Sequence, residues 1–218
     1  MRIALLSANL GGFEQKIVEN VPQSVKIDQF RFTDENFPPR FNSMTPRLQA
    51  RIPKMWGWKM VPGYNYYIWV DSSCNLSHPD SVKWFLDQCK NTDLAVFKHP
   101  NRNSIQEEAN YLKERLTIKC PYITPRYENE MIDEQLVAIK EDKEYVDNKL
   151  YASTAFIYKN SGRVHGLLSH WWTHTSLYHS IDQLSFPYVI WKSKCSVNVI
   201  PESYLKTKYI SYTRNKKI

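Results

Sequence analysis

The chain has few of the features that mark membrane-spanning, secreted or highly flexible proteins. No apolar run reaches the length of about 18 residues that a membrane-spanning helix needs. The opening stretch MRIALLSANLGG has too short an apolar run for a secretory signal. Only six of the 218 residues are glycine, so few positions favour left-handed backbone. We therefore expect one soluble, folded domain without a membrane span.

The cysteines are few and far apart in the sequence. No C-x-x-C pair occurs, which argues against zinc ribbons and dithiol redox centres. The histidines contain no H-E-x-x-H zinc motif. We expect four free thiols in a reducing compartment, and hence a cytoplasmic protein. The cysteines are Cys74, Cys89, Cys120 and Cys195.

Positive charge prevails but is spread along the chain. The 29 Lys and Arg residues exceed the 22 Asp and Glu residues and give a net charge of +7. No block of about five consecutive basic residues occurs. The charge favours an anionic partner, and a nucleotide phosphate accounts for it as well as a nucleic acid does. A non-catalytic basic domain that binds nucleotides or nucleic acid is therefore an alternative to an enzyme, although no RNP-like segment is present.

Strand and helix patterns alternate along the sequence. This alternation predicts an α/β fold with a mixed, mostly parallel central sheet flanked by helices. Thr45 is expected to cap a helix that begins at Pro46, and Ser77 to cap the next helix. The expected strands are 2–8, 25–32, 66–70, 93–99, 150–160 and 196–200. The expected helices are 46–60, 78–90, most of 104–144, 163–178 and 180–194.

Asp71 and His99 stand where two of the expected strands end. Ligands collect beyond the carboxyl ends of parallel strands, because loop amides and helix N-termini converge there. Asp71, followed by Ser72 and Ser73, offers oxygen ligands that suit Mg²⁺ or Mn²⁺ shared with a diphosphate. Asp71 could equally cap a turn. The residues alone do not decide between these interpretations.

The helix expected at 46–60 carries three basic residues on one face. Arg47, Arg51 and Lys54 recur at i, i+4 and i+7. A solvated basic face is the simpler interpretation, and the alternative places one or more of these side chains against a diphosphate.

Three motifs in order carry a resemblance to a known family. They are YYIWVDSS, AVFKHPNRNSIQEEA and HSIDQLSFPYVIWK. Together they resemble the glycosyltransferase-like domain of the plant mucilage and tapetum-degeneration type. More broadly they resemble GT-A nucleotide-sugar transferases, including glycosyltransferases encoded by chloroviruses. The resemblance spans roughly residues 46–192.

The resemblance implies a single GT-A domain, with a nucleotide-binding half at 1–100 and an acceptor-binding half at 101–218. It implies transfer of a hexose or deoxyhexose from a nucleotide diphosphate sugar, preferably a UDP-sugar, to a hydroxyl of a glycan or glycoprotein. Mn²⁺ or Mg²⁺ would assist the sugar transfer. Retaining and inverting enzymes share this fold. A viral chain of this kind would work in the host cytoplasm, without a stable nucleic-acid partner.

The same resemblance assigns donor and metal roles to individual residues. Asp71 matches the first carboxylate of the family's D-x-D motif, whereas Ser73 stands at the second and is a weaker metal ligand. No histidine follows His179, so a late histidine ligand is missing, and the cation would be held by Asp71, Ser73, the diphosphate and water. Arg51 and Lys54 become the preferred diphosphate contacts. The expected donor-binding residues are Ser7, Asn9, Gly11, Arg51, Lys54, Asp71, Ser72 and Arg102.

Acceptor-side roles fall on the third motif and on a tryptophan pair. Asp182 is the candidate catalytic residue, as a general base or by orienting a hydroxyl. Gln183 and Trp172 are candidates for binding the acceptor. The alternatives are structural: Ser180 and Gln183 have the spacing of a capping box, and paired tryptophans are more often core. In the second motif we expect Glu107 to stabilise a helix N-terminus, and the role of His99 stays open.

Overall fold

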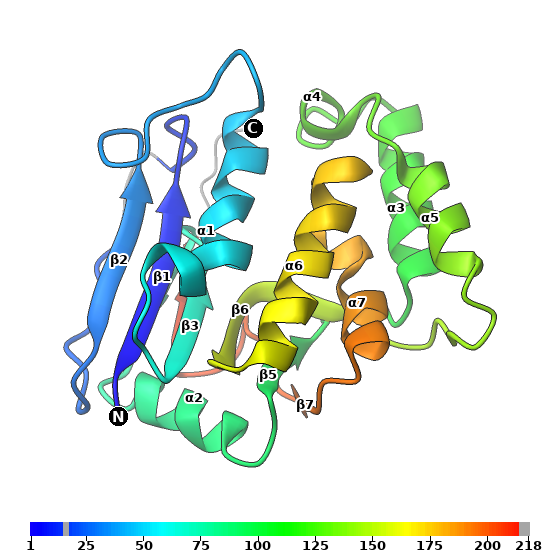
Figure 1. The fold of residues 1–218 in the computed structure, drawn as a ribbon. Coiled ribbons are helices and arrows are strands. Elements are labelled where there is room, and N and C mark those ends of the chain that lie inside the picture. The colour runs from blue at the N-terminus through cyan, green and yellow to red at the C-terminus, as the bar shows by residue number, and fades with distance from the viewer. Residues whose placement is uncertain (15–17, 214–218) are drawn as a thin grey trace.

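The computed structural model describes residues 1–14 and 18–213. Figure 1 shows a central sheet with helices packed around it. The strands are β1 (Ile3–Asn9), β2 (Asp28–Thr33), β3 (Tyr66–Val70), β4 (Cys74–Leu76), β5 (Leu94–Lys98), β6 (Tyr151–Lys159), β7 (Val197–Ile200) and β8 (Ile210–Tyr212). The helices are α1 (Pro46–Met60), α2 (Ser81–Cys89), α3 (Ile105–Thr117), α4 (Thr124–Tyr127), α5 (Ile132–Lys140), α6 (Gly162–Leu177) and α7 (Phe186–Ser193), with the short 3-10 helix η1 (Asp182–Leu184) before α7.

The main sheet has six strands in the order β2-β1-β3-β6-β5-β7. Strand β6 runs antiparallel to its neighbours β3 and β5, while the pairs β1 with β2, β1 with β3 and β5 with β7 are parallel. The predicted mixed, mostly parallel central sheet is therefore confirmed. Since β6 lies between β3 and β5, a strand from the second half of the chain completes a sheet built mainly from the first.

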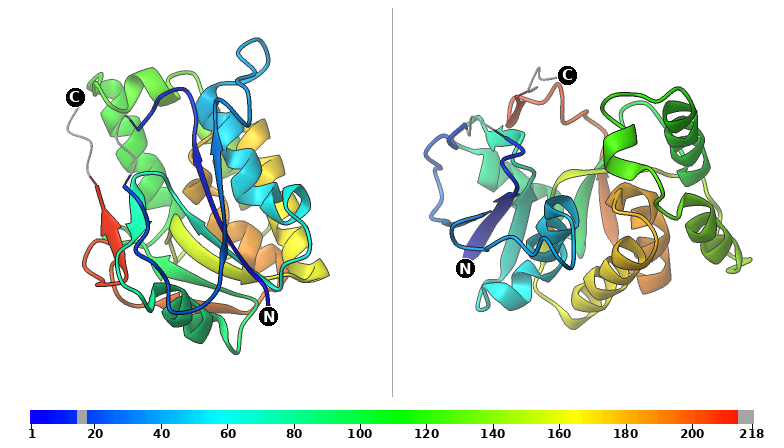
Figure 2. Two further views of the ribbon diagram at one scale, coloured as in Figure 1. Left: turned by 90° about the vertical axis from the view of Figure 1, so that its left-hand side faces the viewer. Right: turned by 90° about the horizontal axis from the view of Figure 1, so that it is seen from above.

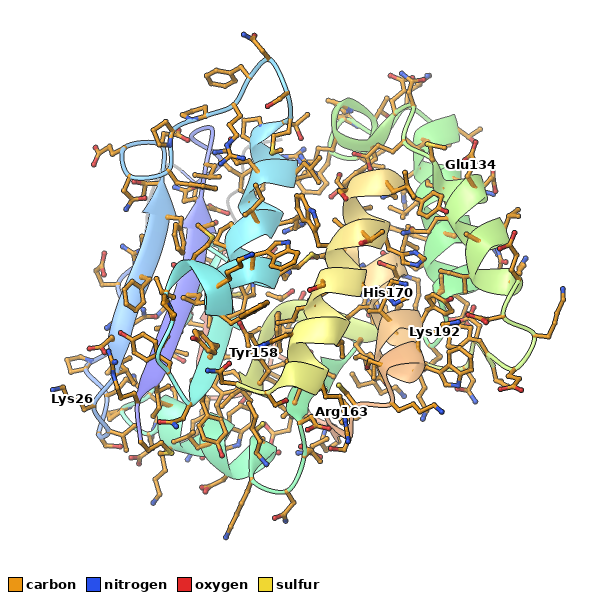
Figure 3. The ribbon with its side chains drawn as sticks, viewed as in Figure 1. Lys26, Glu134, Tyr158, Arg163, His170 and Lys192 are labelled. Atoms are coloured by element: carbon orange, nitrogen blue, oxygen red, sulfur yellow. The ribbon has the colours of Figure 1, made fainter. Side chains whose placement is uncertain are left out.

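Apolar side chains cover both faces of the sheet. On β1, Ala4 and Leu6 pack into the cluster that contains residues of α1, α3, α5, α6 and α7. Ile3 and Leu5 alternate with them and pack into a second cluster with α2, β4 and β8. Figure 2 shows the same arrangement from the side and from above. In Figure 3, Tyr158 of β6 lies inside the molecule, whereas Lys26 and Arg163 lie on its outside.

Helix α1 begins as the sequence predicts. The hydroxyl of Thr45 accepts a hydrogen bond from the Leu48 amide at 3.2 Å, and Pro46 occupies the first turn. The first turn of α1 lies at the end of the sheet toward which β1 and β2 point (Figure 1). The helix therefore delivers its basic residues to the carboxyl ends of the strands.

The second helix differs from the prediction. It begins at Ser81 with Asp80 as its N-cap, and the Ser77 hydroxyl instead donates to the Lys208 carbonyl at 2.9 Å. The preceding residues Cys74–Leu76 form β4, which pairs with β8 near the end of the chain. A pairing over such a sequence distance leaves no local pattern, so neither strand was expected.

The structure bears on two expectations, the free thiols and the lack of a membrane-spanning helix. All four cysteines are free, as predicted. Within residues 1–14 and 18–213, no helix has the length and apolar character to cross a membrane.

Helix α1 packs closely against β1 where Gly57 faces Leu6. A Cβ atom at Gly57 would lie 2.2 Å from Cδ1 of Leu6, a buried residue, whereas a Cβ at Gly166 in α6 would meet nothing within 4 Å. We expect Gly57→Ala to lower the free energy of unfolding by about 1–3 kcal/mol through overpacking. Gly166→Ala should raise it by about 0.5–1 kcal/mol through helix propensity. Urea denaturation of both variants measures this, and equal effects would contradict the close packing.

Candidate functional site

Asp71 follows β3 at the carboxyl edge of the sheet. Its amide donates to the Thr154 carbonyl of β6 at 2.8 Å, which fixes the backbone. Tyr67 and Trp69 face the α1 side of the sheet, and the alternation of the strand carries Asp71 to that side. Its carboxylate accepts a hydrogen bond from Trp69 Nε1 at 2.7 Å, and the side chain remains 30% exposed. The carboxylate is thus aimed at α1 and open to ligands.

Lys54 of α1 reaches the same carboxylate from inside the protein. Its side chain is only 1% exposed, and its ammonium nitrogen lies 3.4 Å from Asp71 Oδ1 and 2.6 Å from Asp182 Oδ2. The ammonium group also lies 5.6 Å and 5.7 Å from the ring centres of Trp69 and Trp171, a distance at which an aromatic face attracts a cation. Lys54 therefore joins the end of β3 to η1.

Asp182 is the most enclosed carboxylate of this network. Its side chain is 5% exposed, and it accepts a hydrogen bond from Ser153 Oγ at 2.8 Å while Arg51 Nε lies at 3.3 Å. Burial alone would raise the pKa of Asp182, but the charges of Arg51 and Lys54 and the Ser153 hydrogen bond lower it below its ordinary value. Asp182 is therefore an ionised carboxylate held by two cations.

Of Arg47, Arg51 and Lys54 on α1, two join the network and one does not. Burial disfavours the charge on Arg51, but Asp182 and Asp71 outweigh this and raise its pKa. Arg51 also donates to the Ser180 carbonyl at 3.4 Å. Arg47 instead lies over the ring of Tyr127, 4.6 Å from its centre. The interpretation of these residues as a solvated basic face is therefore wrong for Lys54. The side chain of Arg51 is also largely buried, at 16% exposed.

The capping box considered as the alternative interpretation of Ser180 and Gln183 is absent. The Ser180 hydroxyl and amide both donate to the carboxylate of Glu130, at 2.5 Å and 2.8 Å. Residues 180–194 form η1 and α7 rather than one helix. Glu130 competes successfully for Ser180 because a carboxylate is a stronger acceptor than a backbone group.

Gln183 and Arg102 meet at a carboxylate that the sequence did not single out. Gln183 donates to one oxygen of Glu108, and Arg102 forms an ion pair with the other. Glu108 is 2% exposed, and the guanidinium of Arg102 lies over Tyr111, 4.1 Å from the ring centre. The second and third motifs are thus joined through Glu108.

His99 and Glu107 have structural contacts. His99 Nδ1 accepts hydrogen bonds from the amides of Asn101 and Arg102, at 3.3 Å and 3.0 Å. Burial, with the charge of Arg102, lowers the pKa of His99 to about 4. Glu107 accepts from the Asn103 amide at 2.7 Å, while its own amide donates to Ser104. The expected role of Glu107 at the helix N-terminus is confirmed.

The exits of β1 and β3 border a common cavity of about 20 Å³. It is lined by Ser7 and Asn9 from β1 and by Ser72 and Cys74 beyond Asp71. Gly11 has a φ of +67° and its amide faces Asp34 at 3.0 Å; a Cβ there would lie 2.7 Å from Pro46. Gly11 thus lets the loop after β1 pass close to the first turn of α1. The donor-binding roles of these residues stay predictions.

Trp172 contacts the main core rather than the Asp71 network. It is half-buried on α6 and packs against the main core cluster. Its neighbour Trp171 is the buried member, stacked on Phe186 at 3.9 Å with its indole nitrogen donating to the Asp182 carbonyl at 2.8 Å. Trp171 therefore supports the site from the core, and acceptor binding by Trp172 stays a prediction.

Glu14 lies in the loop after β1, and the negative charge of Asp71 acts on it. Its backbone amide and carbonyl both bond the side chain of Asn9, each at 2.9 Å. The residue is 6% exposed, and burial together with the negative charge of Asp71 raises the pKa of Glu14. No sequence signal marked it, because the loop that carries it has no repeating pattern.

The oxygen ligands near Asp71 fit a cation that is shared with a ligand. Among residues 1–14 and 18–213, no three His, Cys, Asp or Glu side chains converge as a complete metal site. A carboxylate that is 30% exposed and followed by Ser72 and Ser73 is nevertheless a hard-oxygen set of the kind that Mg²⁺ and Mn²⁺ prefer. Such cations keep water and phosphate ligands, so an incomplete protein shell suits them.

The network predicts a large stability effect for Lys54. Lys54→Met removes the ammonium group that faces Asp71 and Asp182, and we expect the free energy of unfolding to fall by about 3–5 kcal/mol because a buried carboxylate loses a partner. Lys59→Met, an exposed position in the same helix, should change it by no more than about 0.5 kcal/mol. Urea denaturation compares the two variants. A loss for Lys54→Met as small as that of the control would contradict the network.

Two solved structures share this architecture. A glycosyltransferase involved in the glycosylation of the major capsid of PBCV-1 has a TM-score of 0.52 at 8% identity, and the match covers 100% of this chain and 95% of that one. The WbbM bifunctional glycosyltransferase has a TM-score of 0.50 at 9% identity, over 99% of this chain and 46% of WbbM. At such identities the likeness shows the fold alone.

Sequence comparison identifies the family. No curated protein sequence matches the chain significantly. The TOD1/MUCI70 glycosyltransferase-like domain matches residues 40–214, a range that contains Arg51, Lys54, Asp71 and Asp182. This match confirms the resemblance inferred from the three motifs and the prediction of a glycosyltransferase. The chain belongs to the TOD1/MUCI70 glycosyltransferase-like domain family.

Proposed function

We propose that this domain transfers a hexose or deoxyhexose from a UDP-sugar to a hydroxyl group of a glycan or glycoprotein, assisted by Mn²⁺ or Mg²⁺. The observation that carries the proposal is the carboxylate of Asp71, which is fixed at the carboxyl edge of the sheet by Trp69 and Lys54 and is still 30% exposed. Ligands of α/β sheets bind at this edge. Membership of a glycosyltransferase-like family supports a nucleotide sugar as that ligand.

The donor would lie across the exits of β1 and β3. Ser7, Asn9 and Ser72 border the small cavity there and offer polar groups to the nucleoside. The leaving diphosphate needs positive charge, and preorganised cations supply it without reorganising during the reaction. Arg51 and Lys54 are the nearest such groups, held rigidly by Asp182. Arg102 is held by Glu108 at the neighbouring loop.

A divalent cation would be held by Asp71 and Ser73 together with the diphosphate. When bound, it supplies a Lewis acid that stabilises negative charge on the departing diphosphate. Ser73 is the weaker of the two ligands, because a neutral hydroxyl replaces a carboxylate. The protein's part is to orient the Asp71 carboxylate, which Lys54 and Trp69 do by ion pairing and hydrogen bonding.

The acceptor-side roles of Asp182, Gln183 and Trp172 stay predictions. A carboxylate whose pKa is lowered by two cations is a weak base, so the arrangement favours a positioning role for Asp182 through Arg51 and Lys54. Gln183 is oriented by Glu108 and is the better candidate of the three to contact an acceptor hydroxyl.

A donor screen tests the proposed function. We expect UDP-sugars to raise the melting temperature in the presence of Mn²⁺, and at least one of them to be hydrolysed slowly without acceptor. Asp71→Asn should abolish both effects, because the carboxylate that holds cation and donor is lost. Asp87→Asn, at an exposed carboxylate on α2, should leave both unchanged.

The screen has a clear negative outcome. If no nucleotide sugar stabilises or is hydrolysed by the wild-type protein, with or without Mn²⁺, the proposed transferase function is wrong.

A further inference from the structure

We propose that the buried carboxylate of Glu108 organises a subsite for the hydroxyl groups of the transferred hexose, by holding Arg102 and Gln183 in fixed positions. Arg102 and Gln183 contact the sugar, and Glu108 is a positioning residue that acts through them. This inference rests on the proposed function, because the hexose is the one that the UDP donor carries.

Glu108 uses its two carboxylate oxygens to hold side chains from two different motifs. Its side chain is 3% exposed, one oxygen forms an ion pair with Arg102 Nε, and the other accepts a hydrogen bond from Gln183 Nε2. A carboxylate in an ion pair accepts hydrogen bonds and donates none, so it determines which end of the Gln183 amide faces it. Hydrogen bonds to a charged group are stronger than neutral ones, and both side chains are therefore firmly oriented.

The atoms that Glu108 does not hold are suited to sugar hydroxyls. The amide nitrogen of Gln183 faces Glu108, so its carbonyl oxygen Oε1 is left to accept a hydrogen bond, and the terminal nitrogens of Arg102 are left to donate. Among the described residues, neither side chain has a second hydrogen-bond partner. Both are partly exposed, Arg102 at 20%. Because a hydroxyl group both donates and accepts, neighbouring hydroxyls of a hexose match this pair.

The subsite lies on the same side of the sheet as the carboxylate of Asp71. Helix α3, which carries Glu108, packs into the same core cluster as α1. Gln183 directly follows Asp182, and the ammonium group of Lys54 lies 2.6 Å from the Asp182 carboxylate and 3.4 Å from that of Asp71. A short chain of contacts therefore leads from the proposed cation site to Gln183.

The order of the strands places this subsite next to the proposed diphosphate position. Arg102 lies in the loop after β5, where its amide donates to His99 Nδ1 at 3.0 Å. Only β6 separates β5 from β3, whose exit carries Asp71, and with neighbouring strands about 4.7–4.9 Å apart the two exits lie roughly 10 Å apart. With the nucleoside at β1 and β3 and the diphosphate at Asp71, the hexose is the next group of the donor along this edge. An acceptor hydroxyl that attacks this hexose also lies near Gln183.

The ion pair with Glu108 also bears on which sugars the subsite accepts. Glu108 offsets the charge of Arg102, so this guanidinium offers hydrogen bonds to neutral hydroxyls. Without Glu108 the same guanidinium would carry an unpaired charge, which suits the carboxylate of a uronic acid. Glu108 therefore favours a neutral hexose through Arg102.

Calorimetric titration in the presence of Mn²⁺ separates the sugar from the rest of the donor. The probes are UDP, UDP-glucose, UDP-galactose and UDP-glucuronic acid, and we expect the wild type to bind at least one of the two UDP-hexoses more tightly than UDP. Glu108→Gln should leave the affinity for UDP within about twofold and reduce the advantage of that UDP-hexose over UDP by about 3–10-fold, the worth of a hydrogen bond or two. UDP-glucuronic acid should gain at least about fivefold relative to the UDP-hexose. Glu114→Gln, at an exposed position of the same helix, should change none of these ratios.

A second variant keeps the test open if Glu108→Gln does not fold. Gln183→Met, at a partly exposed position, leaves the ion pair of Arg102 with Glu108 intact and should lower the advantage of the UDP-hexose by a similar factor, without a gain for UDP-glucuronic acid. A Glu108→Gln protein that melts lower but keeps the wild-type affinity ratios would show a purely structural residue and overturn the inference. A wild type that binds UDP as tightly as both UDP-hexoses would also overturn it, and would leave donor binding at Asp71 standing. A wild type that binds neither UDP nor nucleotide sugars would overturn both.

Discussion

The charge on Lys54 must be neutralised inside the protein, because its side chain is 1% exposed. Two carboxylates do this, Asp182 from η1 and Asp71 from the end of β3. Replacing such a buried ion pair by apolar residues is often neutral or stabilising, whereas removing one partner is costly. The pair is therefore poorly explained as a source of stability, and better explained as a device that fixes the position of Asp71.

The topology of the sheet makes this network possible. Strand β6 lies antiparallel between β3 and β5, so its beginning lies beside the end of β3. Ser153 then reaches Asp182, and the Thr154 carbonyl receives the Asp71 amide. The elements joined by this network are α1, β3, β6 and η1, so the network links the two halves of the chain.

Local patterns predicted much of the fold and part of the site. The alternation of apolar runs and the cap at Thr45 gave the main strands and α1, and the exit of a buried strand marked Asp71. The sequence distances between partners explain what was missed. Arg51 contacts Ser180 across 129 residues, and Gln183 contacts Glu108 across 75, so no spacing in the sequence could reveal these pairs. Ser180 and Gln183 matched a capping box locally, but Glu130 and Glu108 were stronger partners in the folded chain.

The central claim is that the Lys54–Asp182 pair serves the position of Asp71 rather than stability. The most direct measurement is a comparison of the double variant Lys54→Met with Asp182→Leu against the wild type, by urea denaturation and by calorimetric titration with UDP and Mn²⁺. Because Arg51 also loses Asp182 as a partner, the account predicts that the double variant is no less stable than Lys54→Met alone, in which Asp182 loses a cation, while UDP binding in the presence of Mn²⁺ is lost. A double variant that is stable and still binds UDP with wild-type affinity would contradict it.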